Sequence, residues 1–502
     1  WTRRVPHPVL IGHAASQGGR RAKEKEAARQ AGVGRLRRTV AIEIMDQVQA
    51  KLQSANRSRQ VGALFQLHAL QTLAIAANAV NVLPGTIARF TALTSLDMSN
   101  NGLPDVPPDL GSLTVLTHLN LSYNKLLGLP QTIATLCALR TFDVSHNGIR
   151  LIPVEVGRMT SLRSLDISSN DLVFLPVELE ALETSLTTLR AEDNNIRDPP
   201  LEVLTQGRDA TFTYFRRVRN GQRSRDLVLI DMHLQRLDLN WHNLTVLTAL
   251  ELSGNEIDRL PKSILQLTNL LALKASGNRM TTIVDSEDIS PLSALTRLTV
   301  KGNLLPAMQA HLSALVHLKD LDVSCNLVEA IEKGIEVCTR LRRIQLAENQ
   351  MSSVPKFLFR ILDMQFLNVS YNHVRTVPFA MCFCVELREL DLSYNRVELL
   401  PQEFGNLVNL EYFNLNSNLL RQLPECHPAR ALAGPPSSPA RSDELCTERS
   451  SFRFCTALKS LLLNDNKLAT LPPEIRRLKN LQVWRRLPSF SGIVLCLCDR
   501  CQ

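Results

Sequence analysis

Two groups of cysteines lie close enough together in the sequence to suggest a zinc site. They are Cys496, Cys498 and Cys501 near the C-terminus, and Cys426, Cys446 and Cys455 in a proline-rich stretch upstream. A structural zinc ion is usually held by two paired ligand sets of regular spacing. Neither group has that spacing, so the sequence predicts no metal site and no cofactor.

The sequence also lacks the common catalytic motifs. The sequence contains no Gly-x-x-x-x-Gly-Lys-Ser/Thr phosphate loop, no Gly-x-Ser-x-Gly nucleophile elbow and no His-Glu-x-x-His metal motif. We therefore expect no catalytic residues and a protein that is not an enzyme.

One frame of apolar residues and asparagine repeats along most of the chain. The segment Leu93-x-x-Leu96-x-Met98-x-x-Asn101 recurs, and ten intervals between successive frame asparagines measure 23 residues. The alternating Leu-x-Leu pair predicts a short strand with both leucines facing inward. The asparagine amide is expected to hydrogen-bond backbone groups at the turn. A Leu-Pro, Ile-Pro or Val-Pro pair follows in many repeats and predicts a short helix, because proline suits a helix's first turn.

These motifs resemble the leucine-rich repeat family, and the 23-residue Leu-Pro form resembles its Ras group, which includes plant intracellular members and the animal Shoc/Sur scaffold type. The resemblance covers roughly residues 70–481. It implies an α/β solenoid, a horseshoe with parallel strands on the concave face and short helical returns outside. Because the frame breaks after Asn194 and resumes at Asn255, we expect two arrays.

The breaks in the frame suggest domain boundaries. We expect a basic disordered tail (residues 1–40), an N-terminal cap helix (41–69) and a first array with a helical end-cap (70–218). A linker (219–233), a second array (234–484) with a disordered insertion at 424–457, and an irregular tail (485–502) should follow. The second array is expected to open on a strand at 234–239, which leaves its return segment short between Leu244 and Leu247. Since the chain begins with Trp1, we also expect its natural start to lie upstream.

Outward strand positions of the second array carry the main binding candidates. They combine aromatic with charged and polar side chains: Phe366, Tyr371, Glu389, Asp391, Tyr394, Tyr412, Asn414 and Arg343. Aromatic residues among polar groups on a rigid face are typical anchors of protein interfaces. Tyr371 and Tyr394 also have a simpler interpretation, because each belongs to a Ser-Tyr-Asn turn of the repeat.

Outward positions of the first array are more uniform. Asp97, Asn120, Asp143 and Asp166 occupy the slot between the inward apolar residues, and each is followed two residues later by serine. Neighbouring strands lie about 4.8 Å apart, so these residues predict a polar, mildly acidic stripe and a second binding surface. The same residues are also the ordinary content of a Leu-Asp-Leu-Ser repeat.

Composition and charge limit the function. Residues 1–40 contain ten Lys or Arg and two Glu, which gives +8 of the net charge of +9, so the arrays are nearly neutral and nucleic acid is not their expected ligand. Eleven cysteines without regular spacing favour a reducing compartment. We expect a monomeric, cytoplasmic scaffold or adaptor without a membrane span, with the nucleus as an alternative location.

The family resemblance implies protein partners in Ras-type signalling, namely a small GTPase or its effectors. Two other functions are open: an RNA- or ribosome-associated protein that binds through the basic N-terminal tail, and a substrate receptor of a ubiquitin ligase. Tail-driven binding to RNA would weaken steeply with salt. A substrate receptor would need an F-box-like helical module, which we do not find in the sequence.

Overall fold

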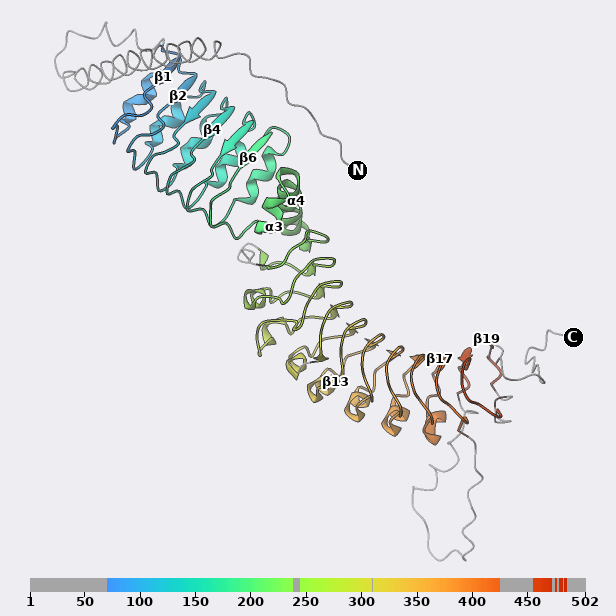
Figure 1. Ribbon diagram of the computed structural model, residues 1–502. Helices are drawn as coiled ribbons and strands as arrows, with labels where there is room; N and C mark the ends of the chain where they lie inside the picture. The colour runs from blue at the N-terminus through green and yellow to red at the C-terminus, as the bar shows by residue number, and fades with distance from the viewer. Residues whose placement is uncertain are drawn as a thin grey trace, which may run out of the picture. The chain divides into compact units, whose positions relative to one another are not determined.

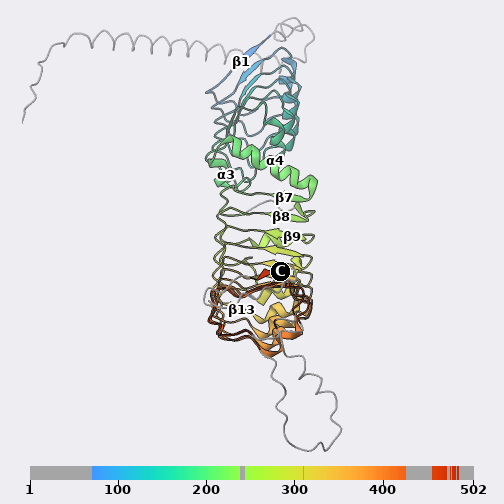
Figure 2. The ribbon, with the colours of Figure 1, turned by 90° about the vertical axis from the view of Figure 1, so that its right-hand side faces the viewer.

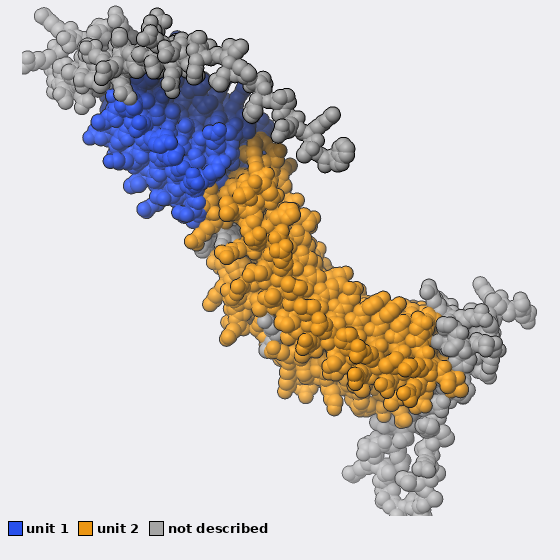
Figure 3. All heavy atoms as spheres, in the orientation of Figure 1, with its two compact units in different colours: residues 1–195 blue, residues 196–502 orange. Residues whose placement is uncertain are grey.

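The computed structural model describes residues 70–237, 244–308, 310–424 and 455–484, except residues 472–474, 476–477 and 482. The predicted basic tail, the predicted cap helix, almost all of the predicted insertion and the predicted C-terminal tail lie outside these residues. The chain divides into two compact units, residues 1–195 (unit 1) and 196–502 (unit 2), which Figure 3 shows in different colours. Each unit is described by itself.

In unit 1, the Leu-x-Leu pairs form strands of three residues that pair in parallel with their neighbours. The middle residue of each strand faces inward, and it is buried in all but the last strand, as Leu96 and Phe142 show. The described residues form one six-stranded sheet in chain order: β1 (Thr72–Ala74), β2 (Ser95–Asp97), β3 (His118–Asn120), β4 (Thr141–Asp143), β5 (Ser164–Asp166) and β6 (Thr188–Arg190).

Short 3₁₀ helices form the return side of unit 1. A proline precedes each of them, and its carbonyl accepts the first helical hydrogen bond, as in the 3.0 Å bond from the Ile87 amide to Pro84. Proline therefore stands mostly just before the helix rather than in its first turn. The helices are η2 (Gly85–Arg89), η3 (Pro108–Ser112), η4 (Gln131–Thr135), η5 (Val154–Arg158) and η6 (Val177–Leu182).

Unit 2 repeats this architecture with a longer sheet. Figure 1 shows strands stacked along one side of each unit. The described part of unit 2 contains an eleven-stranded parallel sheet and a separate pair of two-residue strands, β11 (Ala307–Met308) and β13 (Ala330–Ile331). The sheet runs through β7 (Asp226–Val228), β8 (Ala249–Glu251), β9 (Ala272–Lys274), β10 (Arg297–Thr299), β12 (Asp320–Asp322), β14 (Arg343–Gln345), β15 (Phe366–Asn368), β16 (Glu389–Asp391), β17 (Tyr412–Asn414), β18 (Ser460–Leu462) and β19 (Val483–Trp484).

The helices of unit 2 are of two kinds. Two α-helices open the unit, α3 (Leu201–Thr205) and α4 (Arg208–Ser224). Further 3₁₀ helices lie on the return side: η8 (Lys262–Gln266), η9 (Ser290–Leu292), η10 (Ala310–Ala314), η11 (Lys333–Val337), η12 (Lys356–Arg360), η13 (Phe379–Phe383) and η14 (Gln402–Asn406). The predicted leucine-rich repeat solenoid, with parallel strands and short helical returns, is thus confirmed.

The frame asparagines link successive repeats through their side-chain amides. Asn372, for example, donates from Nδ2 to the carbonyls of Val369 and Ser370 in its own turn and to that of Leu346 in the preceding repeat, at 3.0–3.1 Å. Its Oδ1 accepts the amide of Met351 at 3.0 Å. The same pattern holds at Asn101 and at most later frame positions. The predicted asparagine ladder is present, and it satisfies backbone groups that the core would otherwise leave unpaired.

The start of unit 2 differs from the expected strand at 234–239. The first strand is β7, and Leu227 pairs with Leu250, one 23-residue period later. This register puts Met232 in the asparagine slot and leaves no residues missing between Leu244 and Leu247. In this first repeat, Asn255 of the next repeat accepts both the Met232 and the Leu234 amides.

Helix α4 packs against β7, and both lie in unit 2 (Figure 2). Its buried side includes Phe212, Phe215 and Val218. Gly221 lets the helix approach closely, since a Cβ at this position would lie 3.1 Å from atoms of Leu227. The predicted boundaries had given residues 201–218 to the first array and residues 219–233 to a linker. In the structure these residues form the start of unit 2, and an end-cap role toward unit 1 stays a prediction.

We predict that Asn372→Ala lowers the free energy of unfolding by about 3 kcal/mol, because buried backbone groups of two repeats lose their partners. Denaturant unfolding followed by circular dichroism would measure this loss. The neighbouring exposed residue supplies the control, since His373→Ala should change stability by less than about 0.5 kcal/mol. Equal stabilities of the two variants would contradict the structural role of the ladder.

We also predict that Gly157→Ala destabilises unit 1 by about 1–3 kcal/mol, the usual cost of overpacking. A Cβ at Gly157, in η5, would overlap the backbone carbonyl of Glu178 in η6, so the two helices would have to separate. Gly128→Ala is the matched control, because no atom lies within 4 Å of its Cβ position. Thermal unfolding of the two variants should separate them, and equal melting temperatures would refute the prediction.

Candidate functional site

Each three-residue strand presents its first and third side chains on the outer face of the sheet. We call this surface the strand face of its unit. In the central strands of unit 2, parallel pairing aligns these side chains in rows, so that Arg343, Phe366, Glu389 and Tyr412 lie side by side. The structure therefore brings four of the predicted binding residues together on adjacent strands.

The Arg343 guanidinium stacks on the Phe366 ring, with its Cζ 3.7 Å from the ring centroid. An exposed contact of this kind contributes about 0.5–1 kcal/mol. Phe366 and Tyr412 are half-buried, so neither is a core residue, whereas Leu390 between them points inward and is fully buried. Burial, together with the negative charges of Asp391 and Glu389, raises the pKa of Tyr412.

Tyr371 and Tyr394 occupy a different place. They lie in the turns that follow β15 and β16, with positive φ angles of 52° and 53°. Their rings stack with centroids 4.1 Å apart, and about half of each side chain is exposed. A hydrogen bond with Tyr394 raises the pKa of Tyr371. Both residues thus occupy turns of the repeat, and the stacked pair offers an exposed aromatic surface.

Asp391 and Asn414 are held by hydrogen bonds within the sheet. Asp391 Oδ1 accepts the Ser393 amide and hydroxyl at 2.9 and 2.6 Å, while its Oδ2 accepts Asn414 Nδ2 at 3.1 Å. Asn414 is buried. Both predicted site residues thus serve first to fix the ends of their strands and have little capacity left for a partner.

The predicted stripe of unit 1 lies on its strand face, in the register Asp97–Asn120–Asp143–Asp166. Each member accepts, through Oδ1, the amide and hydroxyl of the serine two residues later, and the hydroxyl bonds measure 2.6–2.7 Å. The serines were expected to extend the outward stripe. Instead their hydroxyls donate to the stripe residues themselves, and Ser122 and Ser145 are buried.

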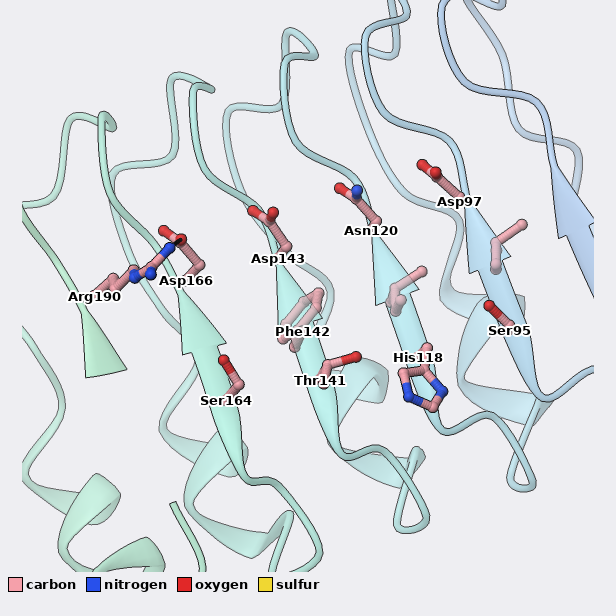
Figure 4. A pocket seen from close by; sticks show the side chains of 12 residues that line it. Ser95, Asp97, His118, Asn120, Thr141, Phe142, Asp143, Ser164, Asp166 and Arg190 are labelled. Carbon is pink, nitrogen blue, oxygen red and sulfur yellow. Dashed lines mark hydrogen bonds and ion pairs between the residues drawn. The ribbon is translucent and has the colours of Figure 1, made fainter. Parts of the chain in front are cut away.

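A shallow hollow of about 370 Å³ follows this stripe (Figure 4). Besides the four predicted residues, it is lined by the first residues of the same strands, which sequence reasoning missed, and by Arg190 at one end. Arg190 Nη1 lies 3.4 Å from Asp166 Oδ2. The missed side chains are Ser95, His118, Thr141 and Ser164. Their position in the sequence could have identified them, because each stands one residue before the inward apolar residue of its strand.

The hollow offers three carboxylates, hydroxyl groups and one imidazole over four adjacent strands. In the described residues around it, Asp97 and Asp143 use only Oδ1 for hydrogen bonds. Beside it, in the turns after β3 and β4, Tyr123 and His146 stack with centroids 4.0 Å apart. This chemistry suits polar and basic groups of a partner.

Within the described residues, no group of three or more His, Cys, Asp or Glu side chains is placed to hold a metal ion. Of the cysteines weighed for zinc, Cys455 is described and buried, and the others lie outside the described residues. In the same part of the chain, none of the helices combines the length and the apolar character that crossing a membrane requires.

Family models agree with the repeat geometry. A leucine-rich repeat model matches residues 92–113, 115–136 and 386–407, and a second leucine-rich repeat model matches residues 158–172. The chain thus contains leucine-rich repeats. Proteins of this fold typically act as non-enzymatic binding scaffolds and mediate protein–protein interactions.

Several solved structures of this repeat fold are similar to the chain. A leucine-rich repeat protein of Leptospira interrogans is 26% identical over 85% of this chain and 92% of its own, with a TM-score of 0.44. The effector YopM of Yersinia pestis is 20% identical over 82% and 87%, with a TM-score of 0.35. The plant peptide hormone receptor RGFR1, solved in complex with RGF2, is 23% identical over 82% and 58%, with a TM-score of 0.39. No curated protein matches the sequence.

Proposed function

We propose that this leucine-rich repeat protein is a scaffold or adaptor whose protein partners bind the strand face of unit 2, with the strand face of unit 1 as a second surface. The observation that carries the proposal is the row Arg343–Phe366–Glu389–Tyr412, where aromatic and charged side chains stand on adjacent strands without filling the core. Half-buried aromatic residues on a rigid support are frequent hot spots.

The size of the surface supports the same function. At about 4.8 Å between strands, the ten strands from β7 to β18 form a face on the order of 40 Å long. A standard interface covers about 800 Å² on each partner. The strand face of unit 2 is therefore large enough for one globular partner or a long extended segment.

We further propose that the protein acts in Ras-type signalling. The 23-residue Leu-Pro repeat supports a place in the Ras group, and the two-block layout is similar to that of leucine-rich repeat-containing protein 40. On that resemblance the partners would be a small GTPase or its effectors. Cytoplasmic location and a monomeric state belong to the same proposal.

Affinity purification of the full chain followed by mass spectrometry would identify partners, which must then be verified with purified proteins. A verified GTPase or GTPase effector would support the Ras-group assignment. If the verified partners bound only through residues 1–40, and with a steep dependence on salt, the RNA or ribosome alternative would replace the scaffold proposal.

With a verified partner, we predict that Phe366→Ala or Tyr412→Ala weakens binding by about 2 kcal/mol, as expected for hot-spot residues. Calorimetric titration would measure the change. Phe383→Ala is the matched control, because Phe383 is also an exposed aromatic residue of unit 2 but lies in η13 on the return side. Leu390→Ala should instead destabilise the fold by about 2–5 kcal/mol. Unchanged affinity in both strand-face variants would show that partners bind elsewhere.

A further inference from the structure

Glu389 is an exposed carboxylate on the strand face of unit 2. It stands on β16 between Phe366 on β15 and Tyr412 on β17, in direct register with both. Two strand spacings of about 4.8 Å separate the aromatic residues. The three side chains therefore stand in one row, with an aromatic side chain on each side of a carboxylate, and we call these three residues the Glu389 slot.

The charge of this slot is not balanced inside the described part of the sheet. The neighbouring carboxylates have cationic or hydrogen-bonded partners: Glu411 contacts Lys459 and Arg388, and Asp391 is bonded by Ser393 and Asn414. For Glu389, by contrast, the described residues provide no ion pair or side-chain hydrogen bond, and its side chain is exposed. A partner can therefore contact this carboxylate without first breaking an existing pair.

Within the protein, the Phe366 ring already contacts a cation. Arg343 on β14 places its guanidinium over the Phe366 ring at 3.7 Å. A cation is attracted to either face of an aromatic ring. The face of Phe366 opposite Arg343 is thus a second position for a cation, and the Glu389 carboxylate next to it adds a charged acceptor that the Arg343 side lacks.

We infer that the Glu389 slot binds a basic side chain, arginine or lysine, that anchors an exposed segment of a protein partner. The cation lies between Phe366 and Tyr412 and forms an ion pair with Glu389. Arg343, two strands away, then faces an acidic residue of the same segment about 10 Å from the anchor. The inference rests on the proposed scaffold function and specifies the chemistry of its partner.

The test uses the full chain and a random peptide library displayed on phage. Selected peptides are synthesised, and their affinities are measured by fluorescence anisotropy with the wild-type chain and its variants. We expect the selected peptides to share an arginine or lysine. Phe366→Ala, Tyr412→Ala and Glu389→Gln should each weaken binding about tenfold, and Glu389→Arg about a hundredfold through like-charge repulsion.

A charge exchange separates recognition from a structural effect. Replacing the peptide's shared basic residue with glutamate should restore binding to the Glu389→Arg chain and abolish binding to the wild-type chain. The control variant is Glu386→Arg, which reverses an equally exposed carboxylate in the turn before β16 and should leave every affinity unchanged.

Two results would overturn the inference in distinguishable ways. Peptides that depend on Phe366 and Tyr412 but carry no shared basic residue, or that bind the Glu389→Arg chain normally, would refute the basic anchor and leave the scaffold proposal intact. If no selected peptide depended on Phe366 or Tyr412, both the anchor and the assignment of binding to this face would fail.

Discussion

The hydrogen bonds of the frame asparagines are the constraint on which the rest of this structure depends. From Asn101 onward, these amides bond to carbonyls of their own turn and of the preceding repeat, so each fixes two turns at once. An amide can bridge two repeats in this way only if they are in register. The ladder thereby aligns the strands, and the alignment decides which side chains become neighbours on the strand faces, including Phe366 and Glu389.

Sequence reasoning could predict this architecture because the restraints are local and periodic. Leu-x-Leu alternation, the frame asparagine and, in many repeats, the proline before the return recur along the chain, so each copy supplies the same prediction again. The first strand of unit 2 was not predicted from the sequence, because its repeat lacks the frame asparagine. Met232 stands in the asparagine slot, and Leu227 could be assigned only once its pairing with Leu250 was known.

Helix α4 shows a second limit of the sequence. Its apolar side, with Phe212 and Phe215, indicates that the helix covers a core edge, but the pattern does not say which array provides that edge. The close approach of Gly221 to Leu227 places the helix on the first strand of unit 2. A close contact of this kind depends on shape complementarity, which no motif in the sequence encodes.

For the candidate site, the register of the strands could be predicted from the sequence. Which side chains are occupied by hydrogen bonds within the sheet could not. Asp391 and Glu389 are both acidic residues of the same three-residue strand, yet Asp391 accepts hydrogen bonds from Ser393 and Asn414, whereas Glu389 is exposed. The Asp-x-Ser pattern is itself the reason, because serine two residues later can reach the carboxylate. Departure from that pattern is therefore the more informative signal: a residue that the repeat does not need for its own hydrogen bonds is one that a partner can use.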